Sequence, residues 1–158
     1  MKKIITISLL ASSLYAGGIF SVGHKNFGFS VGSSSGYGNT YTVVGINANY
    51  FVTDNLSVGA GYTGWFGDNP KINEISIPLT YYIPTESTYN PYAGVIYRHT
   101  FIDAPYDDHD VYGARAGVAM VMSNNTFLSV GWVQEYYDNG IDGSDSRGYP
   151  EINAGFTF

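Results

Sequence analysis

The chain ends in Tyr149-Pro150-Glu151-Ile152-Asn153-Ala154-Gly155-Phe156-Thr157-Phe158. From Ile152 onward every second residue is apolar, and the residues between them are polar or small. Because successive side chains of a strand point to opposite faces, this stretch predicts a β-strand with one apolar face and one polar face. A soluble sheet usually protects an apolar edge with charge or proline, whereas a closed barrel has no edge. The pattern therefore predicts a strand that closes a barrel whose apolar face contacts lipid.

Seven further segments alternate in the same way and are separated by clusters of turn-forming residues. The eight predicted strands are 25–33, 40–52, 56–66, 71–83, 92–102, 111–122, 126–137 and 149–158. Connections of low charge alternate with Gly- and Asp-rich connections, as in transmembrane barrels with an even number of strands. We therefore predict an all-β fold, a closed eight-stranded antiparallel up-and-down transmembrane β-barrel.

Two details depart from the regular pattern. Pro78 lies in the middle of segment 71–83 and cannot donate a backbone hydrogen bond, so it predicts either a weakened strand or a bulge. Residues 17–23 are out of phase with the first strand, which leaves the start of that strand open.

Charged residues avoid the predicted apolar face. No Asp, Glu, Lys or Arg falls on that face in the second to eighth strands, and a charge at the bilayer midplane would cost roughly 2–4 kcal/mol. Five charged residues are predicted to face the lumen: Glu74, Arg98, Arg115, Glu135 and Glu151. Because buried charges need partners, we expect one ionic cluster in the outer half of the lumen. It would act either as a structural plug or as part of a gated or selective conduit.

The beginning of the chain has the features of a secretory signal peptide: Lys2 and Lys3, an apolar run over residues 4–14, and small residues from Ala16 onward. The apolar run is too short to span a bilayer, which takes about 20 residues. We therefore predict a signal peptide at residues 1–16, export by a Sec-type route, and a barrel domain at residues 17–158.

Composition narrows the class of protein. Without Lys2 and Lys3, 5 of the 7 basic residues remain against 13 acidic ones, a formal charge of −8, which disfavours nucleic acid as a partner. Charged residues make up 13% of the chain and aromatic residues 16%, whereas soluble domains carry roughly 25% charged residues. The absence of cysteine removes disulfides and thiolate metal sites.

With its leader, its eight alternating segments and its closing Ile152-x-Ala154-x-Phe156-x-Phe158, the chain resembles the small eight-stranded outer-membrane barrels of Gram-negative bacteria, outer-membrane proteins A, X and W. The resemblance implies an integral outer-membrane location, surrounded by lipid and lipopolysaccharide. It also implies that Ile152, Ala154, Phe156 and Phe158 form the signal that the barrel-assembly machinery recognises.

The resemblance implies a non-enzymatic role, in envelope structure or in surface interaction through extracellular loops, with a surface partner that the sequence does not identify. The alternative is a narrow channel for small or hydrophobic solutes, as likeness to outer-membrane protein W suggests. A soluble periplasmic ligand-binding barrel is a third hypothesis, and it would turn the apolar side chains inward.

Catalysis is not expected. The outer-membrane lipid A deacylase, an enzyme of this architecture, uses a lipid-facing His with a Ser two residues further on. Here Phe101 follows His99 at that distance, so the nucleophile–base pair is missing. His109 lies in a predicted loop without a positioned Ser. We expect His99 to be an interfacial residue near the predicted aromatic girdle, Tyr62, Tyr97, Tyr112 and Tyr136.

The outer loops hold the weak candidates for metal ligands: Asp107, Asp108, Asp110, Asp142 and Asp145. Carboxylate oxygens suit Ca²⁺ or Mg²⁺, but their spacing does not match a calcium-binding loop. We therefore expect solvated acidic loops, no cofactor and no specific metal site. The alternative is that divalent ions bridge these loops to lipopolysaccharide phosphates.

Overall fold

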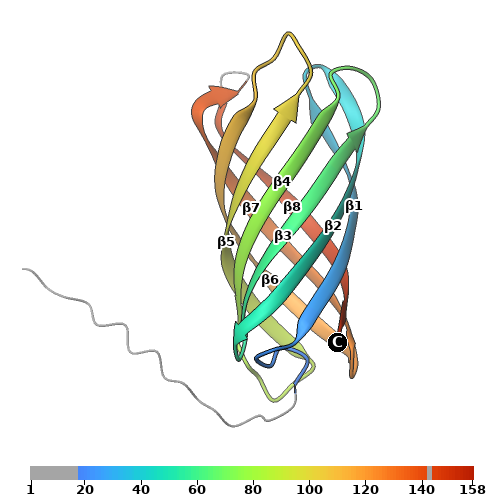
Figure 1. Ribbon diagram of the computed structural model, residues 1–158, viewed down its shortest axis with the longest axis vertical. Coiled ribbons are helices and arrows are strands. Elements are labelled where there is room, and N and C mark those ends of the chain that lie inside the picture. Colours follow the sequence, from blue (N-terminus) through green and yellow to red (C-terminus); the bar gives the residue numbers. More distant parts are fainter. Residues whose placement is uncertain (1–17, 142–143) are drawn as a thin grey trace, which may run out of the picture.

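The computed structural model describes residues 18–141 and 144–158, and they form a closed barrel of tilted strands (Figure 1). The strands are β1 (Lys25–Gly36), β2 (Asn39–Thr53), β3 (Leu56–Phe66), β4 (Ile72–Tyr82), β5 (Tyr89–Ile102), β6 (His109–Ser123), β7 (Thr126–Ile141) and β8 (Ser144–Thr157). Each strand pairs antiparallel with the next along the chain, and β8 pairs with β1. The predicted fold class, with eight strands in sequence order, is confirmed.

The C-terminal strand closes the sheet as the alternation predicted. Its ladder with β1 runs from Asn26 opposite Thr157 to Ser30 opposite Asn153. The terminal residue continues the pairing, because the backbone N–H of Phe158 donates to the Lys25 carbonyl and the Lys25 N–H donates to the Phe158 carbonyl, both at 2.9 Å. The ladder closes the barrel at the inner end of this seam, whereas β1 beyond Ser30 and β8 before Asn153 pair only with β2 and β7.

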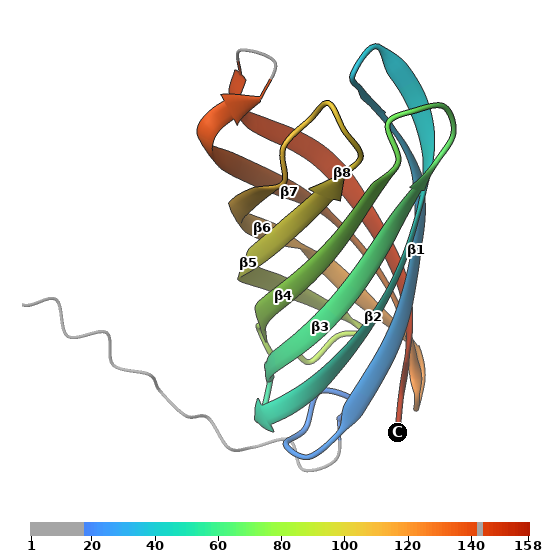
Figure 2. The same ribbon diagram turned by 45° about the horizontal axis from the view of Figure 1, so that its top comes forward.

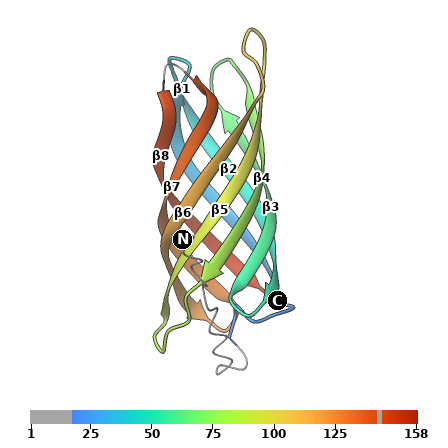
Figure 3. The ribbon, with the colours of Figure 1, turned by 90° about the vertical axis from the view of Figure 1, so that its left-hand side faces the viewer.

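The barrel has two distinct ends, seen from the side in Figures 1 and 3. The inner end carries Phe158 and the turns that join β2 to β3, β4 to β5 and β6 to β7. The outer end, tilted toward the viewer in Figure 2, carries the turns that join β1 to β2, β3 to β4 and β5 to β6. Within residues 18–141 and 144–158, no helix is long and apolar enough to cross a membrane.

Apolar side chains lie on the outside of the barrel and polar ones inside. Ile77, Val95 and Trp132 are each more than half exposed, at 51%, 56% and 53%, whereas the Glu74 and Glu135 residues are 3% and 0% exposed. The orientation predicted from the alternation is therefore confirmed. The hypothesis of a soluble barrel with apolar residues turned inward is wrong.

Pro78 interrupts the sheet without producing a bulge. Between β3 and β4 the pairing Val58–Leu79 and the pairing Gly61–Ser76 share one register, and the ladder is broken only between them. On its other side β4 pairs with β5 without interruption. The missing N–H of proline thus removes local pairing on one side only.

Several strands continue toward the outer end beyond the stretch in which apolar residues alternate. Segment 138–148, which was predicted to be a loop, is largely a continuation of β7 to Ile141 and a beginning of β8 at Ser144. Similarly, β6 begins at His109 rather than Val111. Backbone pairing can continue above the apolar band without apolar alternation, so the sequence pattern gave no signal for these extensions.

Residues 18–24 fold back over the inner end of the lumen and place Phe20 inside it. Phe20 is 6% exposed and stacks on Tyr82, with ring centroids 4.1 Å apart and planes within 9°. Its ring also lies against Phe51 and Phe127, and its carbonyl accepts a hydrogen bond of 2.7 Å from the Asn55 N–H. The out-of-phase segment is thus an inner plug, formed by Ile19 and Phe20, and the predicted signal peptide lies outside the described residues.

We predict that Phe20→Ala lowers the free energy of unfolding by about 3 kcal/mol, because the truncation leaves a cavity among three aromatic rings. Urea unfolding in detergent, followed by gel migration of unheated samples, measures the change. Val22→Ala is the matched control, since Val22 lies on the same segment and is 55% exposed. Equal stability of the two variants would contradict the plug.

Candidate functional site

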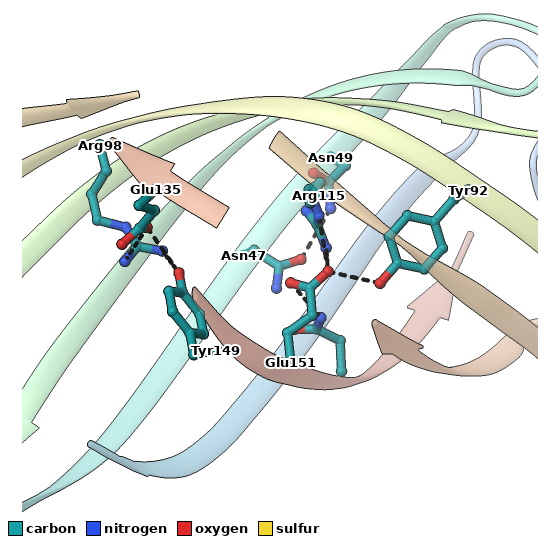
Figure 4. Close-up of polar contacts among 9 residues, drawn as sticks. Asn47, Asn49, Tyr92, Arg98, Arg115, Glu135, Tyr149 and Glu151 are labelled. Carbon is teal, nitrogen blue, oxygen red and sulfur yellow. Dashed lines mark hydrogen bonds and ion pairs between the residues drawn. The ribbon is translucent and has the colours of Figure 1, made fainter. Parts of the chain in front are cut away.

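Arg98, on β5, joins the carboxylates of Glu74 and Glu135 in the outer part of the lumen, and Figure 4 shows it beside Glu135 and Tyr149. Its Nη1 lies 2.8 Å from Oε1 of Glu135 and 3.4 Å from Oε2 of Glu74. Its Nη2 donates a hydrogen bond of 2.7 Å to the Tyr149 hydroxyl. Since the Arg98 side chain is only 11% exposed, these partners supply most of the interactions that water would otherwise provide.

The carboxylate of Glu135 is satisfied at both oxygens. The Tyr149 hydroxyl donates to Oε1 at 2.8 Å, and Nη2 of Arg147 donates to Oε2 at 3.0 Å. Sequence analysis missed Arg147, because it lies in the segment predicted to be a loop, and it missed Tyr149. Both residues could have been found from the sequence, because residues 147, 149 and 151 alternate along one strand and therefore face the lumen together with Glu151. We call Glu74, Arg98, Glu135, Arg147 and Tyr149 the outer group.

A second set of charges lies deeper in the lumen. Nε and Nη2 of Arg115 donate to Oε1 of Glu151 at 3.0 and 2.8 Å, and the Tyr92 hydroxyl donates to the same oxygen at 2.7 Å. The Arg115 guanidinium also lies over the Tyr92 ring, 5.4 Å from its centroid. Tyr92 in turn belongs to the aromatic cluster around Phe20. We call Arg115, Glu151 and Tyr92 the inner group.

The five charged residues predicted to form one cluster are therefore divided between two groups, and only the outer group lies in the outer part of the lumen. Arg115 pairs across the sheet with Gly94, four residues along β5 from Arg98. At about 3.4 Å per residue this places the backbones of Arg98 and Arg115 roughly 14 Å apart along the strand direction, whereas Tyr149 and Glu151 bring the two groups within two residues of each other on β8. Each group pairs equal numbers of Arg and Glu side chains, so neither leaves a buried net charge.

The wall formed by β1 to β3 carries amides and glycines instead of charges. The Asn49 Nδ2 donates to Oδ1 of Asn26 at 2.8 Å and to Oδ1 of Asn47 at 3.0 Å. A Cβ at Gly59 would collide with the Asn49 side chain and with the carbonyl of Ala48. Glycine at this position lets the amides fill the lumen opposite the inner group, as Figure 4 shows for Asn47 and Asn49.

On the outer surface, Asp110 was predicted to lie in an outer loop, but it belongs to the extended β6 and faces outward. It pairs with His99 across β5 and β6, and its Oδ1 accepts from the Tyr97 hydroxyl at 2.8 Å and lies 2.7 Å from the His99 Nδ1. Asp110 lies at the outer end of β6 and has two polar partners, which reduces the cost of its position.

The predicted girdle is a continuous row on three strands, with Tyr97 opposite Tyr112 and Tyr112 opposite Tyr136. The Tyr62 hydroxyl donates to the Asn73 side chain at 2.7 Å. Next to His99 the inward Thr100 is buried, and the exposed Phe101 packs edge to face on the imidazole, so neither neighbour supplies the Ser that the deacylase pattern requires two residues after its His. The imidazole instead shares Asp110 with the Tyr97 hydroxyl at the outer surface.

The acidic residues of the outer end lie apart or bind protein groups. Asp107 and Asp145 are exposed, Asp108 accepts a hydrogen bond of 2.9 Å from the Ile102 N–H, and Asp110 bonds to His99. The described residues contain no group of three or more His, Asp or Glu arranged to hold a metal ion. Asp142 lies outside the described residues.

The proposed assembly signal lies on the outward face of β8. Ile152 and Phe156 are about half exposed, Ala154 is exposed, and Phe158 is 73% exposed at the inner end. These side chains form one accessible apolar row beside β1, whose ladder with β8 is short.

Comparison with known proteins identifies the fold. No protein-family model matches the sequence, and no characterised protein is significantly similar to it in sequence. The N-terminal β-barrel domain of Pseudomonas aeruginosa OprF superposes with a TM-score of 0.66 at 17% identity, covering 87% of this chain and 98% of that domain.

Two further solved structures share the architecture. Neisserial surface protein A gives a TM-score of 0.59 at 20% identity, covering 85% of this chain and 94% of that one. The Yersinia pestis outer membrane protein Ail gives 0.55 at 10% identity, covering 86% and 99%. The chain therefore has the fold of the small eight-stranded outer-membrane barrels, as the sequence resemblance implied.

We predict that Arg98→Ala lowers the free energy of unfolding by about 3–5 kcal/mol, because it leaves Glu74 and Glu135 without their shared partner. Adding Glu135→Gln should restore part of this loss by removing one unpaired charge. Thermal unfolding in detergent measures both variants, with Glu86→Ala in the exposed turn between β4 and β5 as the control. An unchanged melting temperature for Arg98→Ala would show that the outer group does not stabilise the barrel.

The two groups should be energetically independent. Because the backbones of Arg98 and Arg115 lie roughly 14 Å apart along the strand direction and the two side chains share no partner, the effects of Arg98→Ala and Arg115→Ala on the free energy of unfolding should add within about 0.5 kcal/mol in the double variant. Equilibrium unfolding of the single and double variants in one detergent gives the comparison. A coupling above about 1 kcal/mol would instead support one connected cluster.

Proposed function

We propose that the protein is a non-enzymatic, integral barrel of the Gram-negative outer membrane that acts in surface interaction, and in envelope structure, through its outer turns. The observation that carries this proposal is that apolar side chains cover the outside of the barrel and polar side chains fill its inside. Its exterior is apolar, whereas its interior is occupied by paired charges, amides and the inner plug. Chemistry available to partners outside the membrane is therefore concentrated at the outer end.

Three features of the lumen favour this role over the alternative of a narrow channel. The inner plug closes the inner end with Phe20 stacked on Tyr82. The Arg115–Glu151 pair and the outer group then occupy two successive levels. An eight-stranded barrel is just wide enough for its own side chains to fill, so these layers oppose passage of solute.

The names of two proteins with the same fold support a surface role. One is called a surface protein, and another is the attachment invasion locus protein of Yersinia pestis. We extend that role to this chain as a proposal, together with export by a Sec-type route. The exposed apolar row of β8 suits recognition by the barrel-assembly machinery, and the exposed Asp side chains of the outer turns suit contact with lipopolysaccharide through divalent ions.

The surface role is tested by exchanging turns. Residues 103–108, between β5 and β6, are replaced by Gly and Ser in a non-adherent Gram-negative host, and autoaggregation and adherence to an epithelial monolayer are counted. We expect the intact chain to raise one of these at least tenfold and the exchange to abolish the gain. Replacement of residues 84–88, in an inner turn, is the control. No gain with the intact, surface-exposed chain would reject the proposal.

For the channel alternative, we expect the purified chain to give no resolved current steps in planar bilayers. This expectation rests on the inner plug and the two charged groups, which occupy successive levels of the lumen and oppose passage of solute. Phe20→Ala and Arg98→Ala, measured in parallel, should increase current if the corresponding layers are the barriers. Steady conductance by the unmodified chain would favour the channel instead.

A further inference from the structure

Two aromatic rings meet across the outer end of the barrel. Tyr37, in the turn between β1 and β2, lies 4.4 Å from Tyr106, in the turn between β5 and β6, measured between ring centroids. In the order of the closed barrel these two hairpins stand on opposite sides, so the contact spans the mouth of the lumen. Tyr37 and Gly38 both have positive φ, 53° and 78°, as a two-residue hairpin turn requires.

Beneath this contact lie buried polar atoms that have no hydrogen-bond partner among the described residues. Tyr41 and Trp65, 1% and 8% exposed, pack edge to face with centroids 5.6 Å apart, and Tyr37 packs against them. Within the described part of the chain, neither the Tyr41 hydroxyl nor the Trp65 Nε1 has a hydrogen-bond partner. Buried polar groups in folded proteins are normally hydrogen-bonded, so this pair is unusual.

Arg147 adds a third such atom at the same place. Its guanidinium lies between two rings, 5.3 Å from the Trp65 centroid and 5.2 Å from that of Tyr149. Its Nη2 donates to Glu135, whereas its buried Nε lacks a partner among the described residues. Three neighbouring side chains from β2, β3 and β8 therefore present unused hydrogen-bonding atoms below the Tyr37–Tyr106 contact.

The chemistry of these atoms defines the ligand. The Trp65 and Arg147 nitrogens can only donate, and the Tyr41 hydroxyl can donate or accept, so a ligand must offer oxygen acceptors. Aromatic side chains in the same cluster suit a saturated ring that presents a face of C–H groups, as a pyranose does. Anionic ligands are disfavoured by the exposed carboxylates of the outer turns and strand ends, Asp68, Asp103, Asp107, Asp108 and Asp145.

We propose that Tyr41, Trp65 and Arg147 form a subsite for a neutral saccharide unit, and that Tyr37 and Tyr106 form a lid that parts to admit it. The inference rests on the proposed surface role and names the class of ligand for it. Binding exchanges the unpaired buried donors for hydrogen bonds to sugar hydroxyls, and it opens one ring–ring contact between two surface turns.

The sequence offers a direct optical probe. The chain has 2 tryptophans, and Trp132 faces outward, so Trp132→Phe leaves Trp65 as the reporter of the subsite. The folded chain is screened against an array of neutral oligosaccharides, including lactose, N-acetyllactosamine, cellobiose and mannobiose, and against their sialylated or sulfated counterparts where these exist. Binders are then titrated against Trp65 emission.

We expect at least one neutral oligosaccharide to shift Trp65 emission saturably, with a Kd on the order of 1 mM or tighter, and its acidic counterpart to bind at least tenfold more weakly. Tyr41→Phe should weaken binding about fivefold, because one hydrogen bond is lost. Tyr112→Phe, on the outward face, is the matched control and should have no effect. Tyr106→Ala should accelerate association, because the lid no longer has to open.

Each variant is first shown to be folded by heat-modifiable gel migration. If no neutral oligosaccharide binds either the Trp132→Phe chain or the Trp132→Phe, Tyr106→Ala chain, the subsite is rejected. Equal or tighter binding of acidic glycans also overturns it. If the chain confers adherence through its outer turns but binds no saccharide, the subsite is rejected and the surface role is retained. If the chain binds saccharide but confers no adherence, the surface role is rejected and the subsite is retained.

Discussion

Closure of the sheet between β1 and β8 is the constraint on which the rest of the structure depends. In an apolar environment every backbone N–H and C=O group needs a partner within the protein, and an open sheet would leave two edges unpaired. The reciprocal hydrogen bonds between Lys25 and Phe158 extend the closing ladder to the last residue of the chain. Once the sheet is closed, each strand has one face toward the exterior and one toward an enclosed lumen.

Enclosure turns the lumen into a polar core. Glu135 is 0% exposed and would be strongly unfavourable alone, but Arg98, Arg147 and Tyr149 satisfy both of its oxygens. Aromatic layers lie at either end, around Phe20 at the inner end and Trp65 at the outer end. The charges lie between these two aromatic clusters, and the Arg147 side chain remains 30% exposed.

Much of this could be predicted from period-two alternation, because the facing of a side chain depends only on its position within its own strand. The inward facing of Glu74, Arg98 and Arg115 followed in this way. The prediction was incomplete where apolar alternation stops but pairing continues. Arg147 was assigned to a loop for that reason, and Asp110 was placed outside β6 although it pairs with His99.

By itself, the sequence determined the number of strands, their order and which face of each meets the exterior, since these follow from local alternation and from turn residues. Only the tertiary structure decided which charges meet. The heights of Arg98 and Arg115 depend on registers that accumulate strand by strand around the barrel, and no local pattern encodes them. The same holds for Phe20 and Tyr37. Their partners are Tyr82, at the end of β4, and Tyr106, in the turn between β5 and β6, and both are distant in sequence.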